Sequence, residues 1–558
     1  MKTFILGSND RAALTVSREL AKQGFHVEII SLTSSCISLK SKYVKKSYIL
    51  KNKEDINEIF NEIIKIIEPG SFVIPINDYF LTLVLSFFQI FKESFIIPYN
   101  SKESILKIID KYNLLIEASK IGIDIPDSLL IKNIDSFYKI DKNTFKYPLI
   151  FKPRFSCLEQ NNRIITTEVK KVNNYNELEM QIRLNIGYVD VIIQNYIEGF
   201  GRAINFFAVN GDIKNYFQYE RIHEPGFGGG SSLRKSIKVE PKLKKTSLDL
   251  LKSSDYSGIG MIEYRYCPNK KKYFIMEINA RFWGSLSLPV FSGINFPVIL
   301  YDYFIKGKIS KSTYLAEKYS KHVLKDTKWL FIKLKNNKIK LFLSEIKSDF
   351  VRYVSNDMTF DVEKKNDFKP FLFQYVLLFS SLHIKIYEII YRFLIFIYKN
   401  KTRNKDRKQA LNLLLADNIN IVFVCRGNII RSAFAENYFN KLSESRSYSC
   451  GTLYKSERLS PIKALEAAKN IDVDLKYHKS KYINDLEIDL SNSVFFVMNP
   501  KQYIELSKRK KYENVYFLGI FDKDRSLDIK DPYYNPYDLK TYSKIFEQIK
   551  SNIDLMIK

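Results

Sequence analysis

Short apolar runs alternate with helical patterns over residues 1–100 and again over residues 416–558, and this alternation constrains the fold more than any other feature of the chain. KTFILGSND predicts a strand and a turn, RAALTVSRELAKQG predicts a helix that ends at a glycine, and FHVEIISL predicts the next strand. Strands that alternate with helices form parallel sheets with helices packed on their faces. We therefore predict a doubly wound α/β layer at each end of the chain.

The 558 residues are too many for one hydrophobic core, so we expect several domains. Residues 101–310 mix helical patterns with many strands, which predicts an α+β domain. The apolar stretch 371–398 is interrupted by charged side chains, so an uninterrupted membrane span is not expected. The basic stretch KNKTRNKDRK (399–408) predicts a linker. The predicted domains are residues 1–100, residues 101–310, a helical connector with a basic linker over residues 311–415, and residues 416–558.

The formal charge of +27 is compatible with nucleic acid or an anionic membrane surface as a partner. Lysine, isoleucine and asparagine are abundant along the whole chain, however, and no RNP-like, helix-turn-helix or zinc-finger pattern is present. We therefore predict anionic substrates and no nucleic acid. Peripheral docking on an anionic membrane through residues 399–408 stays an alternative.

The five cysteines are odd in number, widely scattered and contain no CxxC pair. This pattern excludes a disulfide framework and a cysteine zinc cluster, and it is typical of a reducing compartment. The first ten residues, MKTFILGSND, lack the long apolar stretch of a signal peptide. We expect the protein in the cytoplasm.

The segment VCRGNIIRS (424–432) places a cysteine between a predicted strand end and a predicted helix start. Gly427 and Asn428 can adopt positive φ, which lets the loop curl and point its amides inward. The positive end of the following helix adds to this field. Such a loop binds a tetrahedral dianion and holds Cys425 as a thiolate nucleophile. The predicted phosphate loop comprises Arg426, Gly427, Asn428, Ile429 and Ile430.

Three further residues complete a predicted reaction at phosphorus. Arg431 offers a planar fork to two phosphate oxygens, and Ser432 can donate its hydroxyl to the thiolate. Asp531, in DPYYNPYD near the C-terminus, is the candidate acid that protonates the leaving oxygen. The predicted chemistry is formation of a cysteinyl-phosphate that water hydrolyses.

C-x5-R-S with GN inside it, followed by a distant DPY, resembles the low-molecular-weight protein-tyrosine phosphatase family. The resemblance covers residues 418–558, where SCGT (449–452), HKSK (478–481) and VFFVMNP (494–500) fall at similar places. It implies Cys425 as nucleophile, Arg431 as phosphate binder and Asp531 as general acid, without a cofactor. Two positions depart from the pattern of the family. The family usually has a second cysteine where this chain has Ile430, and an aspartate where it has Asn499.

The stretch FIMEINARFWGS (274–285) indicates a second site. Side chains alternate along a strand, so Glu277, Asn279 and Arg281 share one face of it. Glu263, in GMIEYRY, adds a carboxylate from a neighbouring strand. Two carboxylates and an amide oxygen suit Mg²⁺ beside phosphate groups, and Arg281 can steady a transferred group.

Three further features accompany this strand: Lys111, Lys152 in YPLIFKP, and the glycine-rich stretch PGFGGGSS (225–232). Together they resemble the ATP-grasp superfamily of carbamoyl-phosphate synthases and carboxylate–amine ligases. The resemblance covers about residues 1–310 and begins with the layer that precedes the ATP-grasp fold. It implies ATP and Mg²⁺ as cofactors and an acylphosphate made from a carboxylate, from which an amine displaces phosphate. It also implies ATP contacts from Lys111, Lys152 and Arg281, adenine contacts from Asn195, Tyr196 and Ile197, and Mg²⁺ ligation by Glu263, Glu277 and Asn279.

These observations predict a fusion of two enzymes, an ATP-grasp ligase and a phosphatase that acts on phosphotyrosine protein or a small aryl phosphate. The ligase would use a small carboxylate and an amine. The alternative is a regulatory protein that binds ATP and phosphotyrosine protein without turning over one or both. The six residues Lys152, Glu277, Asn279, Cys425, Arg431 and Asp531 are all present, which favours catalysis.

Overall fold

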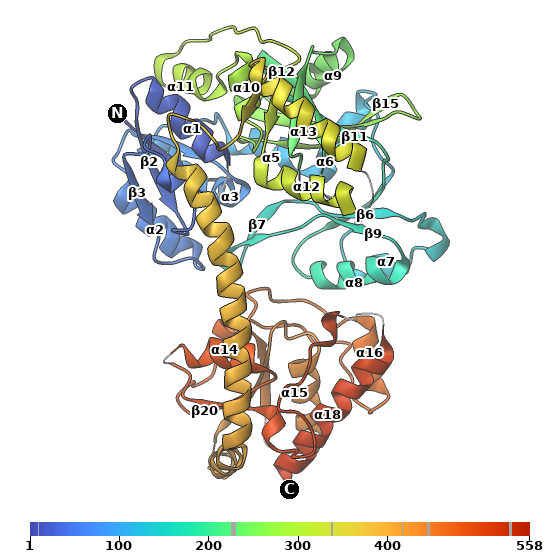
Figure 1. Ribbon diagram of the computed structural model, residues 1–558. Helices are drawn as coiled ribbons and strands as arrows, with labels where there is room; N and C mark the ends of the chain where they lie inside the picture. The colour runs from blue at the N-terminus through green and yellow to red at the C-terminus, as the bar shows by residue number, and fades with distance from the viewer. Residues whose placement is uncertain are drawn as a thin grey trace. The chain divides into compact units, whose positions relative to one another are not determined.

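A computed structural model describes residues 1–8, 11–224, 230–335, 339–416, 418–443, 447–509, 511–534 and 538–558, without the side chains of residues 381–387 and 534. Two compact units make up the chain (Figure 1). The first comprises residues 1–130, 146–171 and 192–379, and the second comprises residues 131–145, 172–191 and 380–558. Most of the glycine-rich stretch 225–232 lies outside the described residues.

The first unit begins with a parallel four-stranded sheet in the order β3-β2-β1-β4. The neighbouring strands β1 and β4 are mostly apolar and buried, as expected for a parallel sheet with helices on both faces. The strands are β1 (Lys2–Leu6), β2 (His26–Ser31), β3 (Lys46–Ile49) and β4 (Phe72–Pro75), and the helices are α1 (Arg11–Lys22), α2 (Ile56–Ile66), α3 (Asp78–Ser86) and α4 (Phe88–Ser94). This is the doubly wound layer predicted for the start of the chain.

The following residues form two further sheets and a hairpin. The larger sheet has seven strands in the order β15-β14-β11-β12-β13-β16-β17 and is antiparallel except for its last pair. Its strands are β11 (Phe200–Val209), β12 (Asp212–His223), β13 (Leu233–Ile237), β14 (Gly258–Cys267), β15 (Lys272–Asn279), β16 (Tyr319–Lys321) and β17 (Met358–Phe360). The smaller sheet has the order β5 (Ser128–Ile131), β10 (Val191–Asn195), β6 (Leu149–Pro153) and β9 (Lys170–Val172), and the hairpin pairs β7 (Cys157–Gln160) with β8 (Arg163–Thr166).

Five helices of this middle part, α5, α6, α7, α8 and α11, begin at side chains that accept the first free amides. Asp110 caps α6 by accepting hydrogen bonds from the amides of Tyr112 and Asn113, and Lys111 is thereby fixed as the first residue of the helix. The helices are α5 (Lys102–Ile109), α6 (Lys111–Lys120), α7 (Ile134–Tyr138), α8 (Tyr175–Asn185), α9 (Pro241–Lys252), α10 (Ser287–Ser292), α11 (Phe296–Lys306), α12 (Val323–Lys335) and α13 (Ile339–Val354).

The C-terminal part of the second unit is built on a parallel four-stranded sheet in the order β19-β18-β20-β21. Its strands are β18 (Asn420–Cys425), β19 (Ser447–Gly451), β20 (Ser493–Val497) and β21 (Asn514–Phe517). The helices are α15 (Arg431–Leu442), α16 (Ile462–Lys469), α17 (Pro500–Ser507) and α18 (Leu539–Ile557). The mixed α/β prediction, with a parallel sheet at the C-terminus, is confirmed.

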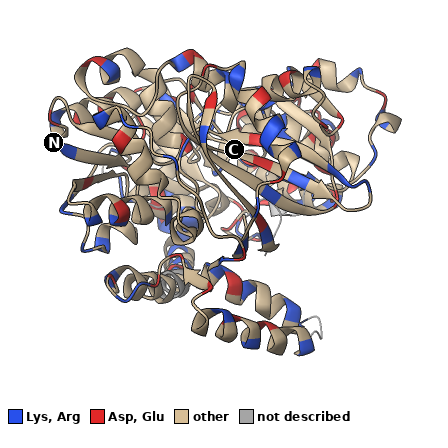
Figure 2. Cartoon of the chain, turned by 90° about the horizontal axis from the view of Figure 1, so that it is seen from above, with Lys and Arg blue, Asp and Glu red and all other residues tan. Residues whose placement is uncertain are grey.

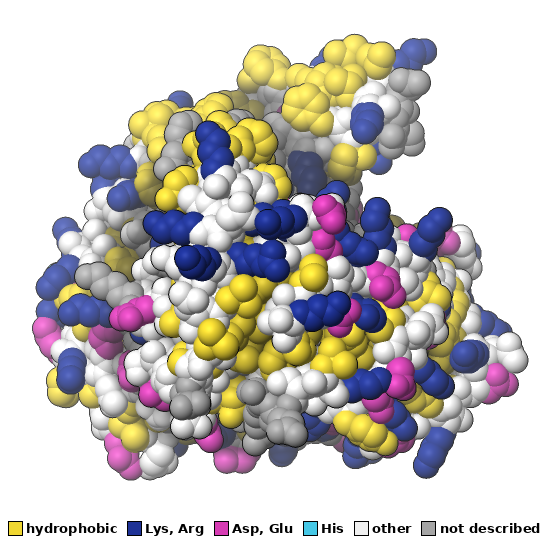
Figure 3. All heavy atoms as spheres, turned by 90° about the horizontal axis from the view of Figure 1, so that it is seen from below, with side chains coloured by type: hydrophobic (Ala, Val, Ile, Leu, Met, Phe, Trp, Pro, Cys, Tyr) yellow, Lys and Arg dark blue, Asp and Glu magenta, His cyan; other side chains and the backbone are white. Residues whose placement is uncertain are grey.

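Helix α14 (Lys369–Leu414) is continuous through residues 399–408, which the composition predicted to be a linker. Lysine and arginine are good helix formers, and Ala410 is fully buried in the core of the second unit, so packing fixes the helix there. None of the helices in the described ranges is both long enough and apolar enough to cross a membrane. Lys and Arg side chains are spread over many elements among acidic ones (Figure 2), and apolar side chains lie beside them on the face seen in Figure 3.

Candidate functional site

Strand β18 ends at Cys425 and helix α15 begins at Arg431, so the phosphate loop lies at the carboxyl edge of the parallel sheet. Asn428 has a φ of 51°, as predicted. Gly427, for which the sequence also predicted positive φ, lies outside the left-handed region. One left-handed residue is enough to turn the loop, and asparagine tolerates this conformation.

Two donors approach the sulfur of Cys425. The Asn428 amide lies 3.2 Å and the Ser432 hydroxyl 3.0 Å from Sγ. Cys425 is 3% exposed, so little water competes with these donors. The structure therefore places Ser432 next to the sulfur, as the sequence predicted, and both donors would stabilise a thiolate.

The side chain of Asn428 connects the loop to two other segments. Its Nδ2 donates to the hydroxyls of Ser432, at 3.0 Å, and Ser449, at 2.7 Å. Its Oδ1 accepts from the Lys481 amide at 2.7 Å. These three hydrogen bonds, two of them buried and one partly buried, hold the loop over the end of the sheet. Ser449 and Lys481 belong to the segments SCGT and HKSK, which the sequence indicated only through the family resemblance. The role of the Asn428 side chain in connecting them was not predicted.

Two further contacts brace the main chain of the loop. The Asn428 carbonyl lies 2.9 Å from Nε2 of His478, and the Gly427 carbonyl accepts a hydrogen bond from Arg458. Burial lowers the pKa of His478, against the effect of that carbonyl, so its imidazole is neutral at pH 7. Gly451 lies on the other side, where a Cβ atom would be 2.9 Å from the Arg426 carbonyl oxygen. A side chain at Gly451 would therefore displace the loop.

Arg431 and Asp531 are 100 residues apart in sequence and form a partly buried ion pair at 2.5 Å. A second nitrogen of Arg431 donates to the Ile529 carbonyl at 2.9 Å. Within the part of the chain that the structure describes, Nε of Arg431 is buried and has no hydrogen-bond partner. This nitrogen is a donor that a bound phosphate group could use.

In the first unit, Glu263 of β14 and Glu277 of β15 face each other as a cross-strand pair. The amide nitrogen of Asn279 is 3.5 Å from a carboxylate oxygen of each. Burial raises the pKa of Glu263, and a 2.5 Å ion pair with Arg221 opposes this. Burial also opposes ionisation of Glu277, but Lys152 and Lys111 lower its pKa.

Lys152 and Lys111 are both buried close to this acidic pair. Lys152 donates to the Met276 carbonyl at 2.5 Å, and burial lowers its pKa to about 8. Lys111 donates to the Ser156 hydroxyl at 2.8 Å. The structure thus brings both predicted lysines to the predicted acidic residues, although the four come from different elements.

Arg281 follows β15 and forms a two-point ion pair with Asp78, at 2.9 and 2.7 Å. It also donates to Oδ1 of Asn279 at 3.2 Å. Burial opposes ionisation of Asp78, yet Arg281 lowers its pKa. Neither Asp78 nor Arg221 was predicted to belong to the site. Asp78 is the first residue of α3, and the available signal for it was the segment IPIND (74–78), in which an acidic residue follows a predicted strand.

The three residues predicted to contact adenine lie at the end of β10, where their described contacts are with other segments. Asn195 donates to Asp127 at 2.9 Å. The ring of Tyr196 has the ammonium of Lys171 4.1 Å from its centroid, and the Ile197 carbonyl accepts from Arg265 at 2.6 Å. None of the three is among the described lining residues of the cavity at the acidic pair.

That cavity has a volume of about 640 Å³ and contains the acidic pair, Asn279 and Arg281. Further lining comes from the doubly wound layer (Arg11 and Cys36), from β13 (Arg234) and from residues that follow β15 and β16 (Trp283 and His322). Burial lowers the pKa of His322 to about 3, so its imidazole is neutral at pH 7. Among the described residues, no three His, Cys, Asp or Glu side chains converge as a metal site. Carboxylate and amide oxygens are the ligand types that Mg²⁺ prefers, and here the Asn279 oxygen accepts from Arg281 while its nitrogen faces the two carboxylates.

Several solved structures resemble about the first half of the chain. They include L-amino acid ligase from Bacillus licheniformis (TM-score 0.42, 15% identity, 56% of this chain and 80% of that chain). N5-carboxyaminoimidazole synthetase from Staphylococcus aureus (0.44, 13%, 57% and 81%) and a biotin carboxylase complex from Campylobacter jejuni (0.44, 16%, 57% and 74%) are similar to the same extent.

No curated protein matches the chain in sequence. One family does match its C-terminal part. Residues 420–558 match the low molecular weight phosphotyrosine protein phosphatase family, which confirms the family that the cysteine loop predicted for this part of the chain.

Proposed function

We propose that residues 420–558 hydrolyse phosphotyrosine, in a protein or as a small aryl phosphate, through a cysteinyl-phosphate. The observation that carries this proposal is the position of the Cys425 sulfur, within 3.2 Å of the Asn428 amide and 3.0 Å of the Ser432 hydroxyl. Arg431 and Asp531 stand together at the same loop. These residue types are the nucleophile, donors and acid that the reaction needs.

In the first step the Cys425 sulfur attacks phosphorus, and the bond from phosphorus to the aryl oxygen breaks. Asp531, as the carboxylic acid, gives its proton to that oxygen. In the second step the Asp531 carboxylate takes a proton from water, whose oxygen attacks phosphorus. The phosphorus–sulfur bond then breaks, and the thiolate and inorganic phosphate are released.

Hydrolysis of p-nitrophenyl phosphate tests this mechanism. Cys425→Ser should abolish turnover because the alcohol is a much weaker nucleophile. Asp531→Ala should slow turnover by about 10²- to 10⁴-fold, which is the usual contribution of a general acid, and leave phosphate binding in place. Undiminished turnover by the serine variant would refute the covalent mechanism. Binding of phosphotyrosine without turnover by the wild type would favour a regulatory protein instead.

For the first unit we propose an ATP- and Mg²⁺-dependent ligase that makes an acylphosphate from a carboxylate and joins it to an amine. The facing pair Glu263 and Glu277, beside two buried lysines, carries this proposal. Glu263, Glu277 and Asn279 would hold Mg²⁺, which when bound neutralises charge on ATP phosphates. Lys111, Lys152 and Arg281 would contact those phosphates.

The proposed reaction has two steps. A carboxylate oxygen of the substrate attacks the γ-phosphorus of ATP, and the bond to ADP breaks. The amine then attacks the acyl carbon, and phosphate leaves while the nitrogen loses a proton. We also propose that Asn195, Tyr196 and Ile197 contact the adenine. The nucleotide would then lie beside the end of β10.

A screen for ADP release by the full-length chain, with pools of carboxylic acids and amines, tests the ligase proposal. Glu277→Gln should abolish ADP release because it removes one proposed Mg²⁺ ligand. ATP binding that needs Mg²⁺ but never gives ADP with any pool would favour a regulatory, nucleotide-sensing unit.

We also propose a cytoplasmic location, because the five cysteines have free thiols. Contact of α14 with an anionic membrane stays an alternative, since apolar side chains on it are exposed beside lysines and arginines. Sedimentation with liposomes at low and high salt decides it, because electrostatic docking must weaken as salt rises.

A further inference from the structure

The second half of α14 is an integral part of the phosphatase unit. Ala410 is fully buried in its core, and Phe396 and Leu411 pack against that core. The guanidinium of Arg403 donates to the main-chain carbonyls of Gly519, Ile520 and Asp522, which follow β21. These contacts hold the preceding turns of α14, around Arg392, beside the phosphate loop.

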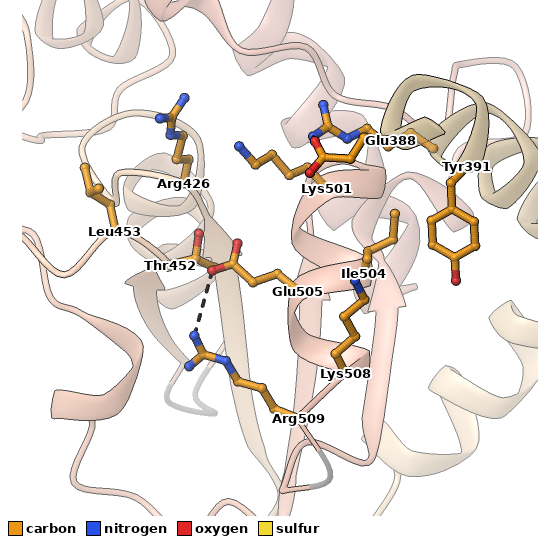
Figure 4. Close-up of a pocket in the computed structure, with 11 residues that line it drawn as sticks. Glu388, Tyr391, Arg426, Thr452, Leu453, Lys501, Ile504, Glu505, Lys508 and Arg509 are labelled. Atoms are coloured by element: carbon orange, nitrogen blue, oxygen red, sulfur yellow. Dashed lines mark hydrogen bonds and ion pairs between the residues drawn. The ribbon is translucent and has the colours of Figure 1, made fainter. Parts of the chain in front are cut away.

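Two adjoining cavities of about 730 and 770 Å³ lie between α14 and the loop. Arg392 of α14, Arg426 of the phosphate loop and Lys501 of α17 line both. The larger cavity also contains Asp531, so it reaches the proposed acid. Figure 4 shows the other cavity, with Arg426 and Lys501 on its facing sides.

The lining of the two cavities carries more positive than negative charge. The basic side chains are Arg392, Arg426, Lys501, Lys508, Arg509 and Lys530, and the acidic ones are Glu388, Glu505, Asp528 and Asp531. Three of the four acids are already in ion pairs, Glu388 with Arg392 at 2.7 Å, Glu505 with Arg509 at 3.9 Å and Asp531 with Arg431 at 2.5 Å.

The remaining lysines of the lining are open to a ligand. Lys501, Lys508 and Lys530 are exposed, and in the described ranges none of them forms an ion pair. Such side chains keep their full charge and attract a negatively charged group that enters the cleft. When a phosphotyrosine of a peptide binds at the phosphate loop, the peptide residues next to it would lie in these cavities.

We propose that α14 forms one wall of the substrate cleft and that Arg392, Lys501 and Lys530 select phosphotyrosine peptides with acidic residues next to the phosphotyrosine. This inference rests on the proposed phosphatase function. An exposed ion pair contributes a factor of about 1.4 to 5 in binding, so two or three such contacts give about a tenfold preference for an acidic peptide. The preference must shrink as salt rises, because these charges are exposed.

The test uses the full-length protein with p-nitrophenyl phosphate and three phosphotyrosine peptides of equal length, flanked by glutamate, glutamine or lysine. We expect kcat/KM to fall in that order. Arg392→Gln and Lys501→Gln should each lower the ratio of kcat/KM for the acidic peptide to that for the neutral peptide about two- to fivefold. Lys544→Gln, at an exposed lysine of α18 outside both cavities, is the matched control and should keep the ratio.

Two failures are distinguishable. Equal kcat/KM on the three peptides, with p-nitrophenyl phosphate still hydrolysed, would overturn the selection of acidic peptides alone. No hydrolysis of p-nitrophenyl phosphate or of any peptide would overturn the phosphatase proposal and this inference with it. A ratio that falls equally in the Lys544 control would show a general charge effect and would also overturn the role of α14.

Discussion

Lys152 is buried in the first unit at a cost in stability, and replacing it measures that cost. Burial is the main cause that lowers its pKa from 10.5 to about 8; Lys111 adds to the effect, while Glu277 and Glu263 oppose it. A lysine whose pKa falls on folding destabilises the folded state below that pKa, and the cost disappears as pH rises from about 8 to 10.5. At about 1.4 kcal/mol for each pKa unit, the cost at pH 7 is about 3 kcal/mol.

Lys152→Met keeps the length of the side chain and removes its charge. The variant loses the hydrogen bond to the Met276 carbonyl, worth about 1 kcal/mol, and it leaves Glu277 with less positive charge nearby. We therefore expect a net gain of about 1 to 2 kcal/mol in the free energy of unfolding at pH 7, and no gain at pH 10.5. Binding of ATP should be lost.

Tryptophan fluorescence during urea denaturation is suited to this measurement, because both tryptophans, Trp283 and Trp329, belong to the first unit. Lys308→Met, at an exposed lysine of the same unit, controls for the general loss of one positive charge. A variant at Lys152 that is less stable than the wild type at pH 7, or whose difference does not change between pH 7 and 10.5, would refute the reasoning.

Three further variants each test one contact that stabilises the fold. Asn428→Ala removes two buried hydrogen bonds and one partly buried one, and it should cost about 3 kcal/mol of unfolding free energy in the second unit, measured by denaturation, and also slow p-nitrophenyl phosphate hydrolysis. Asp361→Asn leaves the buried guanidinium of Arg234 without its 2.7 Å partner and should cost about 3 to 5 kcal/mol in the first unit, followed by tryptophan fluorescence. Asn499→Ala removes the N-cap of α17 and should cost about 1 kcal/mol of unfolding free energy in the second unit, measured by denaturation as for Asn428→Ala, whereas Asn499→Asp should be neutral.

Local sequence patterns predicted the elements that carry the sites. Alternation of strands and helices predicted both parallel sheets, and alternation along residues 274–285 placed Glu277 and Asn279 on one face. The hydrophobic effect acts on such periodic patterns directly, because one face must be buried. The sequence also predicted that Glu263 lies on a strand next to that of Glu277, and in the structure β14 and β15 pair with these two residues opposite each other.

Contacts between distant segments could not be predicted in the same way. Asp78 lies 203 residues from Arg281, and Arg183 donates to the Ser460 carbonyl from 277 residues away. No local sequence pattern encodes such pairs, because they form only when helices and strands from distant parts of the sequence pack together. The helical state of residues 399–408 has the same origin, because burial of Ala410 and the hydrogen bonds of Arg403 to four carbonyls outweigh the polar composition.

The two departures from the phosphatase pattern affect the site differently. Asn499 accepts hydrogen bonds from two amides at the start of α17, which an aspartate would also do, so the local structure keeps its cap. Ile430 is buried and fills space, but it cannot form a disulfide with Cys425. Cys450 lies in the neighbouring strand, where burial and the negative charge of Cys425 raise its pKa and weaken it as a nucleophile. Oxidised Cys425 therefore lacks a reactive thiol partner in the described part of the loop and sheet, and peroxide should inactivate the phosphatase in a way that thiol reductants reverse poorly.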